Sequence, residues 1–272
     1  MPPRVHPAAG FDAALVAQVL DDALASGVRI YGVCGLQGSG KSTLAKQVAA
    51  MARSRGVRVA VLSIDDIYLR RRDRLRLARQ VHPLLATRGP PGTHDVALGC
   101  DTLDALRAGM PVALPRFDKL ADTRLPPSRW RRVGAVDLVL FEGWFLCTPP
   151  QDDDALRDPV NAIERDEDAD ATWRRYCNDA LARDYPALWS RIDRLLFLQP
   201  PDFATVPQWR WQQEQAMQAR RAGSRGLDRA GVERFVALFE RVSRQALRTL
   251  PGIADRTLRL DAQRRPVGWG SA

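Results

Sequence analysis

The sequence predicts an α/β fold, with a mostly parallel sheet that carries helices on both faces. Short apolar runs near residues 28–34, 57–64, 135–141 and 192–198 alternate with segments of helical periodicity, as in chains that build parallel sheets. A glycine-rich turn follows the first run directly, and polar residues end the others. Because sites in such sheets lie at the carboxyl ends of the strands, we expect a functional site at that edge.

The elements can be assigned in chain order from apolar spacing. Phe11, Leu15, Val19 and Ala23 lie four residues apart and predict an amphipathic helix over residues 11–26. The other predicted elements are strand 28–34, helix 44–53, strand 57–64, helix 70–80, loop 88–93, helix 100–108, strands 135–141 and 192–198, and a short fifth strand at 257–260.

Composition limits the class of protein. The chain has 272 residues, of which 45% are hydrophobic and 27% charged, which is typical of a globular protein. No run of 18 apolar residues exists and the N-terminus lacks the apolar core of a signal peptide, so we expect no membrane contact. Four widely spaced cysteines without a CxxC pair predict reduced thiols and a cytoplasmic location. With no repeat or linker, we expect one domain over residues 1–272.

Charge is unevenly distributed. The formal net charge is +9, and it comes from 38 arginines and only three lysines. A basic surface can bind nucleic acid non-specifically or attract anionic substrates, but such an arginine excess more often reflects genome composition, so we expect no nucleic-acid partner. The arginine-rich helix 70–80 is expected to be a solvated face. Residues 152–170 hold nine acidic side chains, which predicts a solvated acidic insertion at about 151–170.

The strongest motif is a phosphate-binding loop. Residues 35–42 match Gly-x-x-x-x-Gly-Lys-Ser between a predicted strand and a predicted helix, where backbone N–H groups converge on phosphate oxygens. Lys41 would bridge the β- and γ-phosphates, and the Ser42 hydroxyl would bind Mg²⁺. The residues expected to hold the nucleotide are Gly35, Gln37, Gly38, Ser39, Gly40, Lys41, Ser42 and Thr43. The motif therefore predicts binding of a nucleoside triphosphate.

Carboxylates at the strand ends predict the reaction. Asp65 and Asp66 end the second strand, and Glu142 ends the third. One carboxylate can hold Mg²⁺, and another can orient and deprotonate an acceptor hydroxyl. Any single one could instead be a helix cap, but three around one loop favour phosphoryl transfer.

Several segments resemble a known family. Residues 63–68 (Ser-Ile-Asp-Asp-Ile-Tyr) resemble the Asp-Asp-Phe-Tyr motif of P-loop kinases that phosphorylate small molecules, such as phosphoribulokinase, uridine kinase and pantothenate kinase. Residues 88–95 (Arg-Gly-Pro-Pro-Gly-Thr-His-Asp), 114–119 (Leu-Pro-Arg-Phe-Asp-Lys) and 140–144 (Leu-Phe-Glu-Gly-Trp) resemble signatures of D-glycerate 3-kinases. The resemblance runs from about residue 28 to residue 250. The segment after Lys119 is shorter than the family pattern and lacks its glycines.

The strands predicted above make a five-stranded sheet. The resemblance implies a P-loop kinase-type fold, a small lid at about 205–226, and ATP-dependent phosphorylation of D-glycerate to 3-phosphoglycerate with Mg²⁺. It implies that Asp65 acts as the base, with Asp66 as second candidate, and that Glu142 lies near the metal. Arg210 falls where related kinases carry a lid arginine over the phosphates.

The acceptor side can also be assigned from the resemblance and from the chemistry of glycerate. Glycerate is a small anion, and arginine suits bidentate capture of its carboxylate. The candidate acceptor-binding residues are Asp66, Tyr68, Arg88, Thr93, His94, Asp95, Arg116, Lys119 and Arg124.

Two alternatives stay open at this point. The same kinase fold could act on a pantothenate-like, nucleoside or sugar-acid hydroxyl. A nucleic-acid-stimulated ATPase would use the basic surface, but it leaves the joint presence of Asp65, residues 88–95 and Lys119 unexplained. The sequence gives no indication of the oligomeric state.

Overall fold

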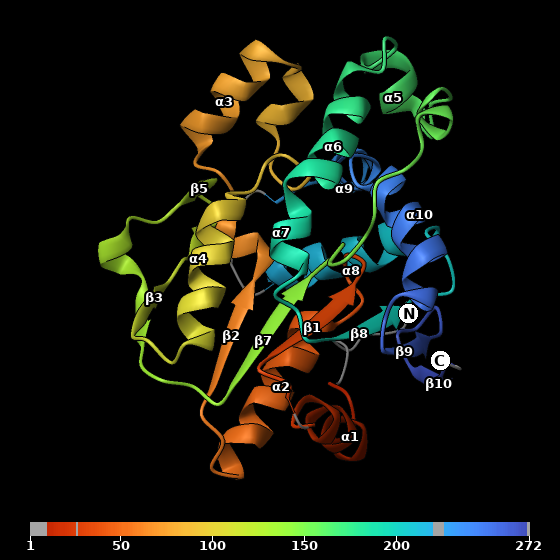
Figure 1. Ribbon diagram of the computed structural model, residues 1–272. Coiled ribbons are helices and arrows are strands. Elements are labelled where there is room, and N and C mark those ends of the chain that lie inside the picture. The colour runs from red at the N-terminus through yellow and green to blue at the C-terminus, as the bar shows by residue number, and fades with distance from the viewer. Residues whose placement is uncertain (1–9, 26, 220–225, 271–272) are drawn as a thin grey trace.

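A six-stranded sheet forms the centre of the computed structural model, which describes residues 10–25, 27–219 and 226–270 (Figure 1). The strand order is β10-β9-β8-β1-β7-β2, and every neighbouring pair is parallel except β9 and β10. The strands are β1 (Ile30–Gly35), β2 (Val59–Ser63), β7 (Leu138–Gly143), β8 (Arg194–Gln199), β9 (Arg256–Leu260) and β10 (Pro266–Trp269). The five parallel strands confirm the predicted sheet. The count of five was one too low, because exposed β10 carries no continuous apolar run.

Helices cover both faces of this sheet, as predicted. On one face, α1 (Ala13–Ala23) and α2 (Lys41–Ser54) pack against alternate strand residues such as Tyr31, Val33 and Leu140. On the other face, apolar residues of four helices join the strand residues between them. Those helices are α4 (Val96–Arg107), α6 (Thr172–Arg183), α7 (Tyr185–Trp189) and α10 (Glu240–Thr249). The apolar strands are buried on both sides because of this layering.

The remaining elements gather beyond the carboxyl ends of the strands or beside the sheet (Figure 1). They comprise helices α3 (Arg71–Gln80), α5 (Ala162–Glu167), α8 (Thr205–Ala219) and α9 (Arg229–Ala237), and the two-stranded ribbons β3 (Val112–Leu114) with β6 (Arg131–Val133) and β4 (Phe117–Asp118) with β5 (Thr123–Arg124). Short 3₁₀ turns lie at η1 (Ile64–Ile67), η2 (Pro83–Ala86), η3 (Pro127–Arg129), η4 (Asp153–Leu156) and η5 (Leu250–Gly252).

Two expectations about charged segments need correction. Helix α3 is largely solvated, but Arg74 is fully buried, where it donates to the backbone carbonyl oxygens of Leu69, Ala86 and Asp122. The acidic segment is not simply a solvated insertion, because Glu164 and Asp168 are buried. Their partners come from helices later in the chain, so the local sequence pattern could not reveal them.

Other sequence predictions concern the lid, the cysteines and the membrane. Helix α8 begins the segment predicted as a lid, whose residues 220–225 lie outside the described residues. The four cysteines are free. Within the described ranges, none of the helices is both long and apolar enough to cross a membrane.

Candidate active site

The phosphate-binding loop connects β1 to α2 and needs glycine for two reasons. Gly38 and Gly40 have φ of 80° and 94°, values that L side chains rarely adopt. A Cβ atom on Gly38 would lie 2.6 Å from the Cβ of Trp209 in α8, so the loop and this helix approach each other closely. The turn leaves the N-terminus of α2 at the loop, which is the arrangement that binds phosphate in nucleotide sites.

Polar atoms around this loop fit a nucleotide with Mg²⁺. The Gln37 amide, Ser39 Oγ and Glu142 Oε2 are buried without a hydrogen-bond partner in the protein. Ser42 Oγ donates to Glu142 Oε1 at 2.8 Å, so the predicted metal residues lie together. Among the described residues, no cluster of three metal-ligating side chains exists. Ser42 and Glu142 would therefore hold Mg²⁺ together with phosphate oxygens and water, which is how this ion is usually bound in kinases.

Asp65 lies at the start of η1, directly after β2, where two other side chains contact its carboxylate. Tyr68 donates its hydroxyl to Oδ1 at 2.6 Å, and Lys119 Nζ lies 2.6 Å from Oδ2. Burial alone would raise the pKa of Asp65, but the charges of Lys119 and Lys41 and these hydrogen bonds outweigh it and hold the pKa far below its usual range. Asp65 is thus an ionised carboxylate that is paired with Lys119 and that also feels the charge of Lys41 in the phosphate loop.

Asp66 has a different environment. Its Oδ1 accepts from the backbone N–H of Phe117 at 3.1 Å, and Arg116 lies 3.5 Å from Oδ2. Burial raises the pKa of Asp66, against the opposing effects of the Phe117 N–H and the Arg116 charge. The side chain therefore anchors β4 of the β4–β5 ribbon, while Asp65 faces the lysines.

The three predicted acceptor-side arginines are placed differently. Arg88 Nη1 lies 2.5 Å from Asp122 Oδ1, and Arg74 holds the other oxygen of that carboxylate at 2.8 Å. Arg124 pairs with Asp95 at 2.8 Å and is mostly buried. Arg116 is 68% exposed. Asp122, which fixes Arg88, was missed because nothing in its local sequence marks it.

Residues 88–95 were predicted to bind the acceptor, but much of their polarity serves the loop itself. The Thr93 hydroxyl donates to Pro90 O and accepts from Gly89 N, and Asp95 caps α4 by accepting from Leu98 N. These two groups thus hold the loop in shape.

His94 differs from its neighbours in this loop. Its Nδ1 lies 2.5 Å from the Tyr185 hydroxyl, its ring packs against the tilted ring of Tyr68 with centroids 4.6 Å apart, and its buried Nε2 has no partner. Burial lowers the pKa of His94 to about 3, despite the nearby charge of Asp65. The imidazole is therefore neutral, with one nitrogen unused by the protein.

Arg210 is held on α8 by two contacts. Its Nη2 lies 2.9 Å from Glu214 Oε2, one turn along the helix, and its guanidinium lies 5.8 Å from the Phe235 ring centroid. The other terminal nitrogen, Nη1, is buried without a partner. The helix is fixed through Trp209, whose Nε1 donates to Ala262 O at 2.7 Å. An unused guanidinium donor on α8 suits the predicted contact with phosphate.

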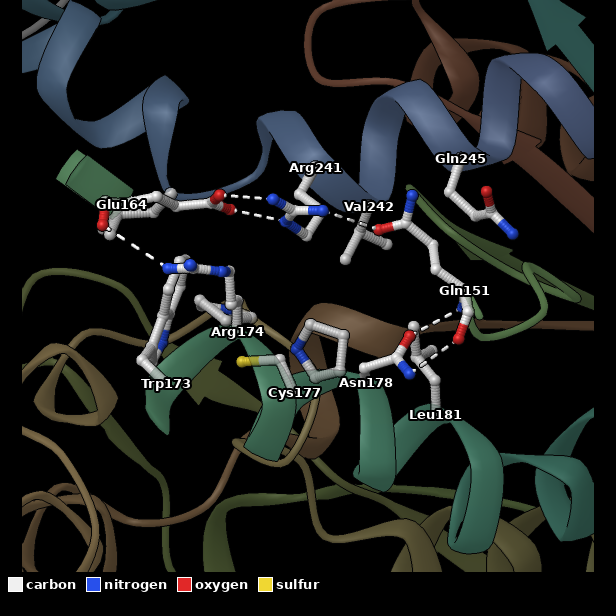
Figure 2. Close-up of a pocket in the computed structure, with 13 residues that line it drawn as sticks. Gln151, Glu164, Trp173, Arg174, Cys177, Asn178, Leu181, Arg241, Val242 and Gln245 are labelled. Carbon is white, nitrogen blue, oxygen red and sulfur yellow. Dashed lines mark hydrogen bonds and ion pairs between the residues drawn. The ribbon is translucent and has the colours of Figure 1, made fainter. Parts of the chain in front are cut away.

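A cavity also lies away from the phosphate loop, between α6, α10 and the segment after β7 (Figure 2). Its main polar side chains satisfy one another: Glu164 pairs with Arg241 at 2.6 Å, and Asn178 exchanges two hydrogen bonds with the backbone of Gln151. Pro90 and Pro91 of the acceptor-side loop line the same cavity. The cavity therefore lies beside that loop, and the pairing of its polar side chains leaves few groups for a ligand.

Comparisons with known proteins agree with this geometry. The family model of the methylmalonyl-CoA mutase-associated GTPase MeaB matches residues 7–71, which include the phosphate loop. An uncharacterized kinase of Schizosaccharomyces pombe, mug58, is 33% identical over 202 residues, which are 70% of this chain and 72% of that protein. The chloroplastic D-glycerate 3-kinase of Arabidopsis thaliana is 30% identical over 222 residues, 77% of this chain but only 46% of the plant protein.

A solved structure extends the similarity to the whole fold. The D-glycerate 3-kinase of Cryptococcus neoformans superposes with a TM-score of 0.77 at 27% identity, covering 95% of this chain and 97% of that one. The fold of almost the whole chain thus occurs in a solved kinase.

Proposed function

This chain belongs to the glycerate 3-kinase-like family of P-loop kinases, and we propose that it transfers the γ-phosphoryl group of ATP to the 3-hydroxyl of D-glycerate. That it is an ATP-dependent kinase of small molecules follows from the family; the choice of D-glycerate is the proposal. The relatives named D-glycerate 3-kinase support this choice.

One observation carries the proposal: Asp65 is paired with Lys119 and also feels the charge of Lys41, and the two lysines have different tasks. Lys41 belongs to the phosphate loop, and Lys119 and Arg88 belong to the acceptor side. A hydroxyl acceptor that reaches Asp65 would therefore have the γ-phosphate on one side and cations on the other. Such a site suits a small hydroxy acid, whose carboxylate would occupy the cationic side.

The proposed transfer uses these residues in one step. Asp65 accepts the proton of the acceptor hydroxyl while the hydroxyl oxygen forms a bond to the γ-phosphorus and the bond from that phosphorus to the ADP oxygen breaks. Lys41 and Arg210 would stabilise the charge on the transferred group. Bound Mg²⁺, held by Ser42 and Glu142, would neutralise phosphate charge.

The test is ADP release from the purified protein with Mg-ATP, with and without D-glycerate, together with identification of the product. Glycerate-dependent ADP formation that yields 3-phosphoglycerate is the expected result. A protein that binds ATP but shows no stimulation by glycerate would contradict the proposal, and a screen of pantothenate-like, nucleoside and sugar-acid acceptors would then find the acceptor. An oligonucleotide arm at 50 and 200 mM salt tests the nucleic-acid alternative.

A further inference from the structure

Lys119 makes a contact that the proposed reaction cannot keep unchanged. Lys119 comes directly after β4 in the β4–β5 ribbon, and its side chain contacts Asp65 while 60% of it stays exposed to solvent. The two charges nevertheless lie only 2.6 Å apart, on the carboxylate that would accept the proton. A cation at this distance disfavours proton uptake by Asp65.

The contact is also easy to exchange. Ion pairs with this much exposure contribute little to stability, because water competes for both partners and a long side chain must be ordered. Arg88, by contrast, is fixed by Asp122, which Arg74 holds from the protein interior. Arg88 is therefore immobilised, whereas Lys119 is on a long, exposed side chain that can exchange its partner.

We propose that Lys119 exchanges partners during turnover, pairing with Asp65 in the empty site and with the anionic group of the acceptor in the occupied site. The exchange makes the base available only when an anionic acceptor has bound, so Lys119 determines specificity for such acceptors. This inference rests on the proposed function, because the new partner is the acceptor carboxylate.

The chemical step stays balanced under this exchange. Lys119 keeps its proton and moves only its hydrogen bond, from Asp65 Oδ2 to a carboxylate oxygen of the acceptor. The acceptor hydroxyl then donates to Asp65, which takes its proton as the new oxygen–phosphorus bond forms and ADP leaves. A neutral acceptor offers Lys119 no new partner, so Asp65 stays paired.

The test compares Lys119→Met with Lys46→Met, which removes an equal charge from an exposed position on α2. Rates are measured with D-glycerate, with glycerol, which has hydroxyls but no carboxylate, and without acceptor. In Lys119→Met we expect kcat/KM for glycerate to fall by roughly 10- to 100-fold, the usual effect of a charge-assisted hydrogen bond. The rate with glycerol should not fall, and ATP hydrolysis without acceptor should rise. Lys119→Arg should keep most of the preference for glycerate, and Lys46→Met should behave as the parent.

A second variant separates the exchange from a structural role. If hydrolysis rises because Asp65 is released, then adding Asp65→Asn to Lys119→Met should abolish the increase. Equal loss with glycerate and glycerol, or unchanged hydrolysis without acceptor, would overturn the proposal. A parent protein that ignores glycerate would contradict the proposed function alone, since the acceptor-free measurement still reports whether Lys119 restrains Asp65.

Discussion

Asp65 and Asp66 are neighbours in the chain, yet their surroundings assign them different tasks. The pKa of Asp65 is lowered by two lysines, whereas that of Asp66 is raised by burial. We expect Asp65→Asn to lower kcat by about 10²-fold or more while leaving the KM for ATP nearly unchanged, because an amide cannot accept the proton.

Asp66→Asn should mainly raise the acceptor KM, since it weakens the anchor of β4. Steady-state kinetics with each substrate varied checks both, and near-normal turnover of Asp65→Asn would remove it from the base role.

His94 makes the stability of the protein depend on pH. Its pKa is about 3 in the folded protein, because of burial, against an ordinary value of 6.5. Between these two pH values, His94 of the unfolded chain binds a proton that His94 of the folded protein does not. The folded state therefore keeps its full stability with respect to this residue above pH 6.5 and loses stability as the pH falls towards 3. Lowering the pH from 7.5 to 5.5 should cost about 1.4 kcal/mol through this residue. Urea unfolding of the parent and of His94→Gln at both pH values measures this loss of stability. An equal loss in both proteins would contradict its assignment to His94.

The local part of the site could be predicted from sequence, but the pairing of its residues could not. The phosphate loop is a contiguous motif, so Lys41 and Ser42 were identified by spacing. Asp65 and Lys119 are 54 residues apart, and their contact depends on how the β4–β5 ribbon folds over η1. Asp122, which fixes Arg88, is one of many acidic residues, and its role follows from tertiary structure alone.

At the scale of elements, the phosphate loop depends on the helix that packs against it. Gly38 and Gly56 both have φ near 80°, but only at Gly38 would a Cβ meet another element, at 2.6 Å from Trp209. Gly38→Ala and Gly56→Ala should therefore share a backbone cost of about 1 kcal/mol. Only Gly38→Ala should also weaken ATP binding, by about tenfold or more, because the phosphate-binding N–H groups are displaced. Calorimetric titration with a non-hydrolysable ATP analogue distinguishes them, and equal affinities would contradict the packing argument.

The acidic segment is held to the rest of the molecule by buried charge. Glu164 receives two hydrogen bonds from Arg241 of α10, and both side chains are almost completely buried (Figure 2). Glu164→Gln leaves the arginine charge without its carboxylate and should lower the free energy of unfolding by about 3–5 kcal/mol. Glu233→Gln, which breaks the exposed pair with Arg229, should cost no more than about 0.5 kcal/mol. Urea denaturation measures the change in the free energy of unfolding for both variants. Similar values would support the original prediction that the acidic segment is a solvated insertion.

The elements that sequence predicted best are those whose apolar pattern is continuous. Strands β1, β2, β7 and β8 are buried by helices on both faces, so their residues form uninterrupted apolar runs. The ribbons β3–β6 and β4–β5 contain two or three residues per strand and are partly exposed, which leaves no periodicity to detect. Their positions depend on contacts such as that between Asp66 and the Phe117 backbone.

At the scale of the whole molecule, we propose that residues 1–272 form one domain, because both core clusters share the central sheet. Residues of β1, β7 and β8 contribute to the core on both faces. The phosphate loop follows β1 and Glu142 lies near the end of β7, so ligand binding should stabilise the whole core and not one part of it.

Thermal unfolding tests this coupling. We expect a single unfolding transition with the same midpoint by tryptophan fluorescence and by circular dichroism. Mg-ATP should shift this whole transition to a higher temperature. At a concentration 100 times its Kd, a ligand of the folded state adds about 2.7 kcal/mol, which corresponds to a rise in Tm of about 5 °C for a domain of this size. Lys41→Ala, which weakens phosphate binding, should lose most of the shift. Two transitions of which Mg-ATP moves only one would contradict the single domain, because the strands that carry the phosphate loop would then unfold independently of the helices around them.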